Sequence, residues 1–201
     1  ASGEIFADES HATKFPREIR RRDLHMVERV GKGAFGEVWK AMLDEMVARS
    51  TPEYVVAAKT VLDPINNPEG SHELVAEATV MMQVNGHPNL VSIIGVITTG
   101  TPLVLVLQYC ELGALNIYLK KTFASGKEIE MDTKMGMAQG VADGMAHLVD
   151  LQFIHRDLAA RNILLSHGKG GNVVCKIADF GLSRGANNET DANEDNENYY
   201  K

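Results

Sequence analysis

Three polar side chains with the chemistry of phosphoryl transfer lie close together in the second half of the chain. Asp157 and Asn162 belong to the segment IHRDLAARN at 154–162, and Asp179 belongs to the segment ADFG at 178–181. A carboxylate beside a hydroxyl group can accept its proton, and further carboxylate or amide oxygens suit Mg²⁺. Because phosphoryl transfer depends mainly on positioning and charge neutralisation, these residue types point to that reaction.

Each segment taken alone also has an ordinary structural interpretation. Two carboxylates and an amide can be polar loop residues, and Asp-Phe-Gly by itself is a common turn-like tripeptide. Here Asp-Phe-Gly follows the segment IHRDLAARN, and an apolar hairpin pattern over 163–177 separates the two. This combination favours the catalytic interpretation over the structural one.

A glycine-rich turn in the first half of the chain could approach phosphate oxygens. Gly31, Gly33 and Gly36 share the three-glycine spacing of dinucleotide-binding folds, in which a helix follows the last glycine. Here the next residues, 37–40, alternate as a strand does, so the turn is predicted to join two strands and lie over phosphates. The strand disfavours a nucleotide-binding oxidoreductase, the alternative that the glycines alone would allow.

Together these segments resemble the catalytic domain of protein tyrosine kinases, within the eukaryotic protein kinase superfamily. The resemblance extends over about residues 20–201 and implies ATP and Mg²⁺ as cofactors and tyrosine hydroxyls of proteins as acceptors. It implies that Asp157 accepts the tyrosine proton and that Asn162 and Asp179 hold Mg²⁺. Self-association for phosphorylation of one copy by another is a further expectation.

The resemblance is to tyrosine kinases because of the residues after Asp157. Serine/threonine kinases carry a lysine two residues after the catalytic aspartate, whereas this chain has Ala159 there and Arg161 four residues after Asp157. The arginine can reach the same anionic region from a different starting point, which leaves room for a phenol. Arg161 is therefore expected to belong to the catalytic set.

The segment VVAAK at 55–59 resembles the kinase strand that presents a lysine to the α and β phosphates. Among apolar neighbours, the Lys59 ammonium needs a counter-charge, and the helix expected after it offers Glu77. Glu73 is an alternative partner. Glu77 is preferred because Val80, Met81 and Met82 follow it as the family pattern implies.

The resemblance also assigns an adenine site between two lobes, where a flat ring can lie between apolar side chains and bond to backbone. It implies a roof of Val30, Val38 and Ala57, a floor of Leu164, a gatekeeper at Leu107, and hinge contacts from the Gln108 carbonyl and the Cys110 amide. Nothing in this pattern requires Cys110 to be a reactive thiolate.

The same resemblance gives a structural role to His155, packed beneath Phe180 in a stack with Met81 and Ile93. It makes Arg156, together with Arg184, a partner for phosphotyrosine on the segment that follows.

Residues 185–198 are rich in asparagine and acidic side chains and lead to Tyr199 and Tyr200. Such a composition buries little apolar surface, so this segment is expected to act as an activation loop ordered by phosphorylation of those tyrosines.

The elements that must position these residues are expected to form two lobes, the α+β architecture of protein kinases. Apolar periodicity predicts a helix over 69–84 and five strands of one sheet, over 24–30, 37–41, 54–61, 90–97 and 103–109. Helices are expected next over 115–123 and 132–151. Asp132 is the expected N-cap of the second, and its core stripe is expected to be Met135, Ala138, Val141, Met145 and Leu148.

Composition agrees with an intracellular enzyme. The 201 residues are 44% hydrophobic and 23% charged with a formal net charge of −7, so no basic field recruits nucleic acid. Cys110 and Cys175 lie in apolar runs and are expected to be core thiols rather than a disulfide. No apolar run is long enough for a bilayer span.

The expected division is a juxtamembrane-like linker at 1–22, a kinase N-lobe at 23–109, and a hinge with a partial C-lobe at 110–201. Four arginines in the linker either touch an anionic membrane surface or are simply solvated, namely Arg17, Arg20, Arg21 and Arg22. The expected location is the cytoplasm, either as a cytosolic protein or as the cytoplasmic portion of a receptor, with membrane contact only through flanking regions.

The chain is expected to be an incomplete catalytic domain, because Lys201 precedes the Ala-Pro-Glu motif and most of the helical lobe of such kinases. The fragment is expected to have low stability and little activity by itself. The alternative function is a truncated, non-catalytic regulator that binds nucleotide or partners.

Overall fold

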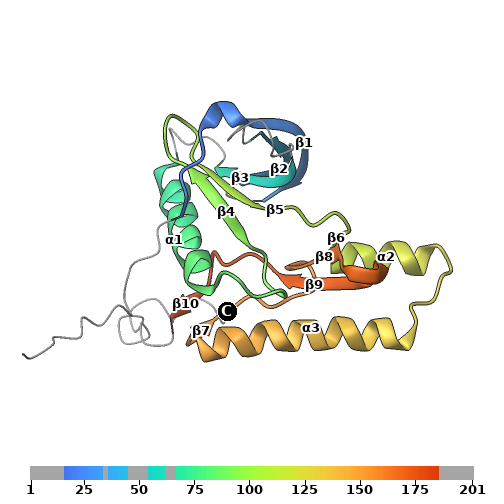
Figure 1. Cartoon of the computed structure of the whole chain (residues 1–201). Helices are drawn as coiled ribbons and strands as arrows, with labels where there is room; N and C mark the ends of the chain where they lie inside the picture. Colours follow the sequence, from blue (N-terminus) through green and yellow to red (C-terminus); the bar gives the residue numbers. More distant parts are fainter. Residues whose placement is uncertain (1–15, 34–35, 45–53, 62–66, 186–201) are drawn as a thin grey trace, which may run out of the picture.

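The computed structural model describes residues 16–33, 36–44, 54–61 and 67–185 (Figure 1). In the first part, strands form a single antiparallel sheet in the order β1-β2-β3-β5-β4. Their bounds are Leu24–Lys32 for β1, Gly36–Leu43 for β2, Tyr54–Val61 for β3, Ile93–Ile97 for β4 and Val104–Gln108 for β5. The predicted five-stranded antiparallel sheet is therefore confirmed.

The strand predicted over 90–97 begins later than expected. Leu90 forms a single parallel bridge with Ile177 instead of joining the sheet, and β4 starts at Ile93. Leu90 and Val91 are buried because they pack against Ile177 of the second lobe, not because they pair within this sheet. Periodicity cannot distinguish these two kinds of burial.

Alternation along β3 decides which of its side chains faces the site. Val56, Ala58 and Thr60 are buried on one side, while Lys59 lies on the other. In the register of the sheet, Lys59 pairs with Val38 of β2. The lysine therefore projects next to the strand that leaves the glycine-rich turn.

Helix α1, Pro68–Val84, is the helix predicted over 69–84. The Asn67 side chain caps its first turn by accepting a hydrogen bond from the Gly70 amide at 2.9 Å. Its buried residues recur at helical spacing, namely Gly70, Leu74, Glu77, Ala78, Met81 and Val84. Glu77 thus lies on the face that packs against the sheet, which is unusual for a carboxylate.

The second lobe contains two helices and a small sheet. The helices are α2, Leu115–Ala124, and α3, Met131–Asp150. Strands β6, Gly113–Ala114, β8, Ile163–His167, and β9, Val173–Ile177, form one antiparallel sheet, and β7, Phe153–Ile154, pairs with β10, Arg184–Gly185. In Figure 1, α3 runs beneath the β8–β9 hairpin.

The face of α3 that packs inward differs from the predicted stripe. Met135 and Ala138 are exposed, so their assignment to the core was wrong, whereas Leu148 is buried and Val141 and Met145 are partly buried. The buried residues of α3 include Met137, Gly140 and Gly144. A Cβ on Gly144 would lie 2.9 Å from both the Asn89 carbonyl oxygen and Ile177 Cδ1. The helix approaches its neighbours along the face that carries these glycines and Met137, whereas Met135 lies outside it.

The predicted N-cap of α3 was also wrong. Glu130 occupies that position without a side-chain capping bond, and Asp132 lies within the first turn. A carboxylate there still interacts favourably with the positive end of the helix dipole.

Within the described residues, no helix is both long and apolar enough to span a bilayer. The free thiols Cys110 and Cys175 are both buried, as predicted.

Residues 16–23, which the sequence placed mostly in a linker, extend the sheet beyond β4. Glu18 forms a parallel bridge with Val96, the Ile19 amide donates to the Val96 carbonyl at 2.7 Å, and the Val96 amide donates to the Arg17 carbonyl at 2.8 Å. A Cβ on Gly95 would lie only 2.5 Å from the Arg17 carbonyl oxygen. The close approach requires glycine at 95.

Side chains hold the same segment in place. The Glu18 carboxylate accepts hydrogen bonds from the Thr98 amide at 2.9 Å and the Thr98 hydroxyl at 3.0 Å. Arg21 donates to the Thr99 and Pro102 carbonyls at 3.1 and 2.6 Å. Ile19 is 3% exposed and packs in the core cluster on that side of the sheet.

We expect Ile19→Ala to lower the free energy of unfolding by about 2–4 kcal/mol, because it removes a buried side chain and leaves a cavity. Arg22→Ala, at a side chain 76% exposed in the same segment, is the matched control and should change stability by less than about 0.5 kcal/mol. Urea unfolding followed by circular dichroism measures both. Equal effects of the two substitutions would show that residues 16–23 do not contribute to the folded core.

Candidate active site

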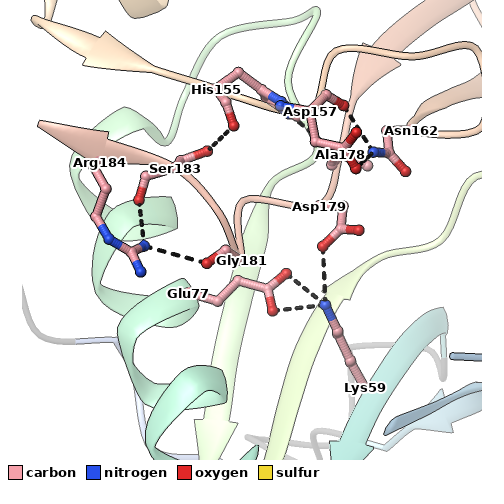
Figure 2. A network of polar contacts seen from close by, with 10 residues as sticks. All are labelled: Lys59, Glu77, His155, Asp157, Asn162, Ala178, Asp179, Gly181, Ser183 and Arg184. Carbon is pink, nitrogen blue, oxygen red and sulfur yellow. Dashed lines mark hydrogen bonds and ion pairs between the residues drawn. The ribbon is translucent and has the colours of Figure 1, made fainter. Parts of the chain in front are cut away.

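The β8–β9 hairpin brings together the polar residues that are far apart in the sequence. Ile163 pairs with Ile177, so Asn162 directly before β8 and Ala178 directly after β9 are neighbours. The Ala178 amide donates to the Asn162 carbonyl at 2.8 Å. The hairpin register thereby places Asp179 beside the loop 155–162, as Figure 2 shows.

Asn162 fixes the carboxylate of Asp157. The Asn162 side-chain amide donates to the Asp157 carbonyl at 2.9 Å and to Asp157 Oδ2 at 2.8 Å. Arg161 donates to the other carboxylate oxygen, Oδ1. The amide nitrogen of Asn162 is thus engaged by Asp157, which leaves its amide oxygen as the group suited to a metal.

The hydrogen bond from Arg161 lowers the pKa of Asp157, and the bond from Asn162 adds to this effect against a smaller opposing influence of burial. The carboxylate is therefore ionised at neutral pH and able to accept a proton. Each carboxylate oxygen has two lone pairs, so one bond to each leaves acceptor capacity for a hydroxyl group.

Lys59 and Glu77 form a two-pronged ion pair between β3 and α1. The Lys59 ammonium lies 2.8 Å from Glu77 Oε1 and 2.7 Å from Oε2. Of the two carboxylates considered from the sequence, Glu77 is thus the partner, and Glu73 is exposed on the helix. Asp179 Oδ1 lies 3.5 Å from the same ammonium. In Figure 2, dashed lines join the Lys59 ammonium to both carboxylates.

Burial alone would lower the pKa of Lys59, but the carboxylates of Glu77 and Asp179 outweigh that influence and raise it. The ammonium is therefore charged at neutral pH. One of its two carboxylate partners, Asp179, belongs to the second lobe, so the positive charge of Lys59 lies where the two lobes meet.

Asp179 has the position and chemistry of a metal ligand. Its backbone adopts the left-handed conformation with φ 64°, which costs free energy for a residue other than glycine. Its carboxylate is half exposed, whereas Asn162 is buried. Among the described residues, no cluster of three or more His, Cys, Asp or Glu could hold a metal by itself. One carboxylate and one amide oxygen fit Mg²⁺, which usually keeps waters and phosphate oxygens as its remaining ligands.

His155 has the structural position that the sequence suggested. Its ring lies 5.3 Å from the Phe180 ring, and Phe180 packs in one core cluster with Met81 and Ile93. His155 Nδ1 accepts a hydrogen bond from the Asp157 amide at 3.3 Å. Nε2 therefore carries the proton and donates to the Ala178 carbonyl at 3.1 Å. The imidazole links the loop of Asp157 to the segment of Asp179.

Sequence reasoning missed Ser183 as part of this support. Its hydroxyl donates to the His155 carbonyl at 3.2 Å, and it is 1% exposed. Arg184 donates to the Ser183 and Gly181 carbonyls at 2.8 and 3.3 Å. A serine after Asp-Phe-Gly-Leu carries no spacing signal of its own, so only the fold reveals this contact.

Two glycines of the turn, Gly36 and Gly33, differ in whether packing within the chain excludes a side chain at their position. A Cβ on Gly36 would lie 2.5 Å from the Thr60 carbonyl oxygen in β3, so strand packing excludes a side chain there. A Cβ on Gly33 would meet nothing closer than 3.9 Å. Packing within the described chain therefore leaves room at Gly33, where an approaching phosphate would still favour glycine.

The residues predicted around adenine lie along the sheet and at its exit. Val30 is 48% exposed, and most of the others are partly buried, namely Val38, Ala57, Leu107, Gln108 and Leu164. Ala57 pairs with Leu107 in the register of β3 and β5. Cys110 is buried, and burial raises the pKa of its thiol to about 11, so the thiol is protonated at neutral pH.

A cavity of about 300 Å³ is lined by several of the residues that the sequence predicts to be catalytic. It is lined by Gly36 and Lys59 from the sheet, Glu77 from α1, Asp157 from the loop before β8, and Asp179 and Gly181 after β9, among others. Residues from both lobes thus share one solvent-accessible space. Tyr199 and Tyr200 lie outside the described residues.

A model of the family described as protein tyrosine and serine/threonine kinase matches residues 24–200. The chain is 37% identical over 171 residues to the ephrin type-B receptor 5 of Gallus gallus, covering 85% of this chain and 16% of that protein. It is 37% identical over 182 residues to the ephrin type-A receptor 7 of Gallus gallus, covering 90% and 17%. It is 35% identical over 186 residues to the ephrin type-B receptor 1-A of Xenopus laevis, covering 92% and 18%.

The chain therefore belongs to the protein tyrosine and serine/threonine kinase family. Its sheet with one packed helix, followed by helices and the β8–β9 hairpin, has the bilobal architecture of that family. The chain spans less than a fifth of the length of these curated relatives.

Breaking the buried ion pair should cost more than removing it. We expect Lys59→Met to lower the free energy of unfolding by about 3 kcal/mol, because Glu77 is left buried without its partner. The double variant Lys59→Met, Glu77→Leu should recover most of that loss, since an apolar pair replaces both charges. Urea unfolding of the two variants tests this. A double variant less stable than Lys59→Met would contradict the coupling inferred from the geometry.

Proposed function

We propose that this chain provides the ATP site and catalytic loop of a protein tyrosine kinase, which transfers the γ-phosphate of ATP to tyrosine hydroxyls in proteins. One observation carries the proposal: Lys59, Glu77, Asp157 and Asp179 line one cavity between two lobes, and Asn162 is hydrogen-bonded to Asp157. Residues 23–109 would form the N-lobe, and residues 110–201 the hinge and the part of the C-lobe present here.

In the proposed mechanism, Lys59 neutralises charge on the α and β phosphates, and Glu77 holds its ammonium in place. The backbone of the glycine turn at Gly31, Gly33 and Gly36 covers the phosphates. The apolar roof and floor enclose adenine, with the Gln108 carbonyl and the Cys110 amide as its hydrogen-bonding partners.

Asn162 and Asp179 are the residues that would hold Mg²⁺, which when bound supplies positive charge opposite the phosphate oxygens. Asp157 orients the tyrosine hydroxyl and accepts its proton as the oxygen attacks the γ-phosphorus. The bond between the γ-phosphorus and the bridging oxygen of the β-phosphate breaks, and ADP leaves. The lowered pKa of Asp157 keeps the carboxylate ionised for this step.

Preference for tyrosine rests on Ala159 and Arg161. Arg161 donates to Asp157 from the position four residues later. Alanine at 159, where serine/threonine kinases carry a lysine, would leave space for the acceptor side chain. A phenol must reach Asp157 from farther away than a serine hydroxyl does, so this space favours tyrosine. The similarity to the ephrin receptors supports the same preference and a location in the cytoplasmic portion of a receptor.

Regulation is proposed to act through Tyr199 and Tyr200. Their phosphates would pair with Arg156 and Arg184, whose guanidinium groups suit phosphate recognition. Arg184 lies in β10, which pairs with Ile154 directly before the catalytic loop. A phosphate bound to Arg184 would therefore influence the position of Asp157, because only His155 and Arg156 separate Ile154 from Asp157. Phosphorylation of one copy by another is the natural route to this state.

Asp157→Asn should lower phosphate transfer by a factor of about 10²–10⁴, because the amide cannot accept the tyrosine proton. The natural polypeptide that contains these residues is incubated with Mg²⁺, radiolabelled ATP and a poly(Glu,Tyr) acceptor, and its variant is treated identically. A poly(Glu,Ser) acceptor is the specificity control and should remain unlabelled.

Labelling of both acceptors at similar rates would refute tyrosine specificity. Equal labelling by the wild type and the Asp157→Asn variant would refute the role of Asp157. If the wild type binds ATP but labels neither acceptor, the non-catalytic regulator becomes the correct function.

A further inference from the structure

A second cavity, of about 430 Å³, opens beside the hinge and contains none of the proposed catalytic groups. The loop after α1 contributes His87 and Pro88, and the region of β4 contributes Ser92 and Ile94. Gln108 from the end of β5 and Lys176 from β9 complete its principal lining. Of these residues, only Gln108 also belongs to the proposed nucleotide site.

Lys176 is a buried cation without a matching anion. It is 8% exposed, and its ammonium donates to the Pro88 carbonyl at 2.6 Å. In the part of the chain that the structure describes, no carboxylate lies within ion-pair distance of this ammonium. An ammonium has three N–H donors, so one carbonyl satisfies it only in part.

Neighbouring groups do not compensate for this burial. Loss of hydration lowers the pKa of Lys176, although Cys110 and Glu111 oppose the change. The Glu111 carboxylate acts on Lys176 only from beyond ion-pair distance, and it accepts a hydrogen bond from the His167 amide at 2.7 Å. An anion from outside the chain would restore the interaction that Lys176 lacks.

The lining determines which anion fits. Burial and the neighbouring His147 lower the pKa of His87, so the His87 ring is neutral at pH 7. Gln108, Ser92, Pro88 and Ile94 carry no charge, so Lys176 is the one residue of the described lining with a positively charged side chain. Pro88 and Ile94 provide apolar wall. One cation beside an apolar wall matches a monocarboxylate better than a multiply charged phosphate.

We propose that this cavity binds a small monocarboxylate with an apolar body. The carboxylate accepts hydrogen bonds from the Lys176 ammonium, and the apolar body packs against Ile94 and Pro88. This site is independent of phosphoryl transfer, so it stands or falls separately from the proposed kinase activity.

Benzoate is the probe, and benzamide, with the same ring and no charge, is the matched control ligand. The chain of residues 1–201 is labelled with ¹³C in its lysines, and the Cε signal of Lys176 is assigned from its loss in Lys176→Arg. We expect benzoate to shift this signal saturably and to raise the titration midpoint of Lys176, because an anion stabilises the ammonium. Benzamide should do neither.

Lys176→Met should weaken benzoate binding about tenfold or more, because a charge-assisted hydrogen bond is lost. Lys169→Met is the control variant, since Lys169 is an exposed lysine in the turn of the same hairpin, and it should bind as the wild type does. Circular dichroism verifies that both variants are folded.

Three results would overturn the proposal: no saturable shift of the Lys176 signal, an equal response to benzamide, or unchanged benzoate binding by a folded Lys176→Met. The first two are observed on the wild-type chain, once the conservative Lys176→Arg variant has given the assignment, and so remain decisive even when Lys176→Met fails to fold.

Discussion

The ion pair between Lys59 and Glu77 is the interaction on which the geometry of the site depends. It places a cation from β3 and a carboxylate from the inward face of α1 at 2.7–2.8 Å, with Asp179 3.5 Å from the same ammonium. Dehydrating two charges offsets most of their attraction, so a buried pair contributes more to position than to stability. Through this one contact, the orientation of α1, the side chain of β3 and the segment after β9 are set together.

The second constraint is the register of the β8–β9 hairpin, which holds the catalytic loop against the Asp179 segment. Phe180 and His155 fill the space beneath, and the core cluster that contains Phe180 includes side chains of α1, β5 and α3. Both sides of the hairpin carry residues with positive φ, Arg156 at 66° and Asp179 at 64°. Such conformations persist only where surrounding packing requires them, so the packing below holds the polar groups above in place.

Much of this arrangement could be predicted from the sequence, because alternation in the strands and spacing in α1 report which face is buried. The motif residues identified Lys59, Glu77, Asp157, Asn162 and Asp179. The structure places four of them around one cavity and bonds the fifth, Asn162, to Asp157. The inward face of α3 could not be predicted, since glycines at 140 and 144 permit close packing that hydrophobicity does not reveal. The attachment of residues 16–23 was missed as well, because a single buried isoleucine among arginines does not produce the hydrophobic periodicity from which a strand or helix is predicted. Contacts such as Ser183 with His155 depend on the turn after Phe180, which no local pattern specifies.

The central claim is that these groups together hold the phosphates of ATP with Mg²⁺, and isothermal titration calorimetry of the 201-residue chain with ATP tests it most directly. Asp179→Asn is the matched variant, since Asp179 is half exposed and its loss should leave the fold intact. We predict saturable binding at one site that weakens at least several-fold when Mg²⁺ is chelated or Asp179 is replaced. Absence of saturable binding by the folded chain, or binding unaffected by both changes, would contradict it.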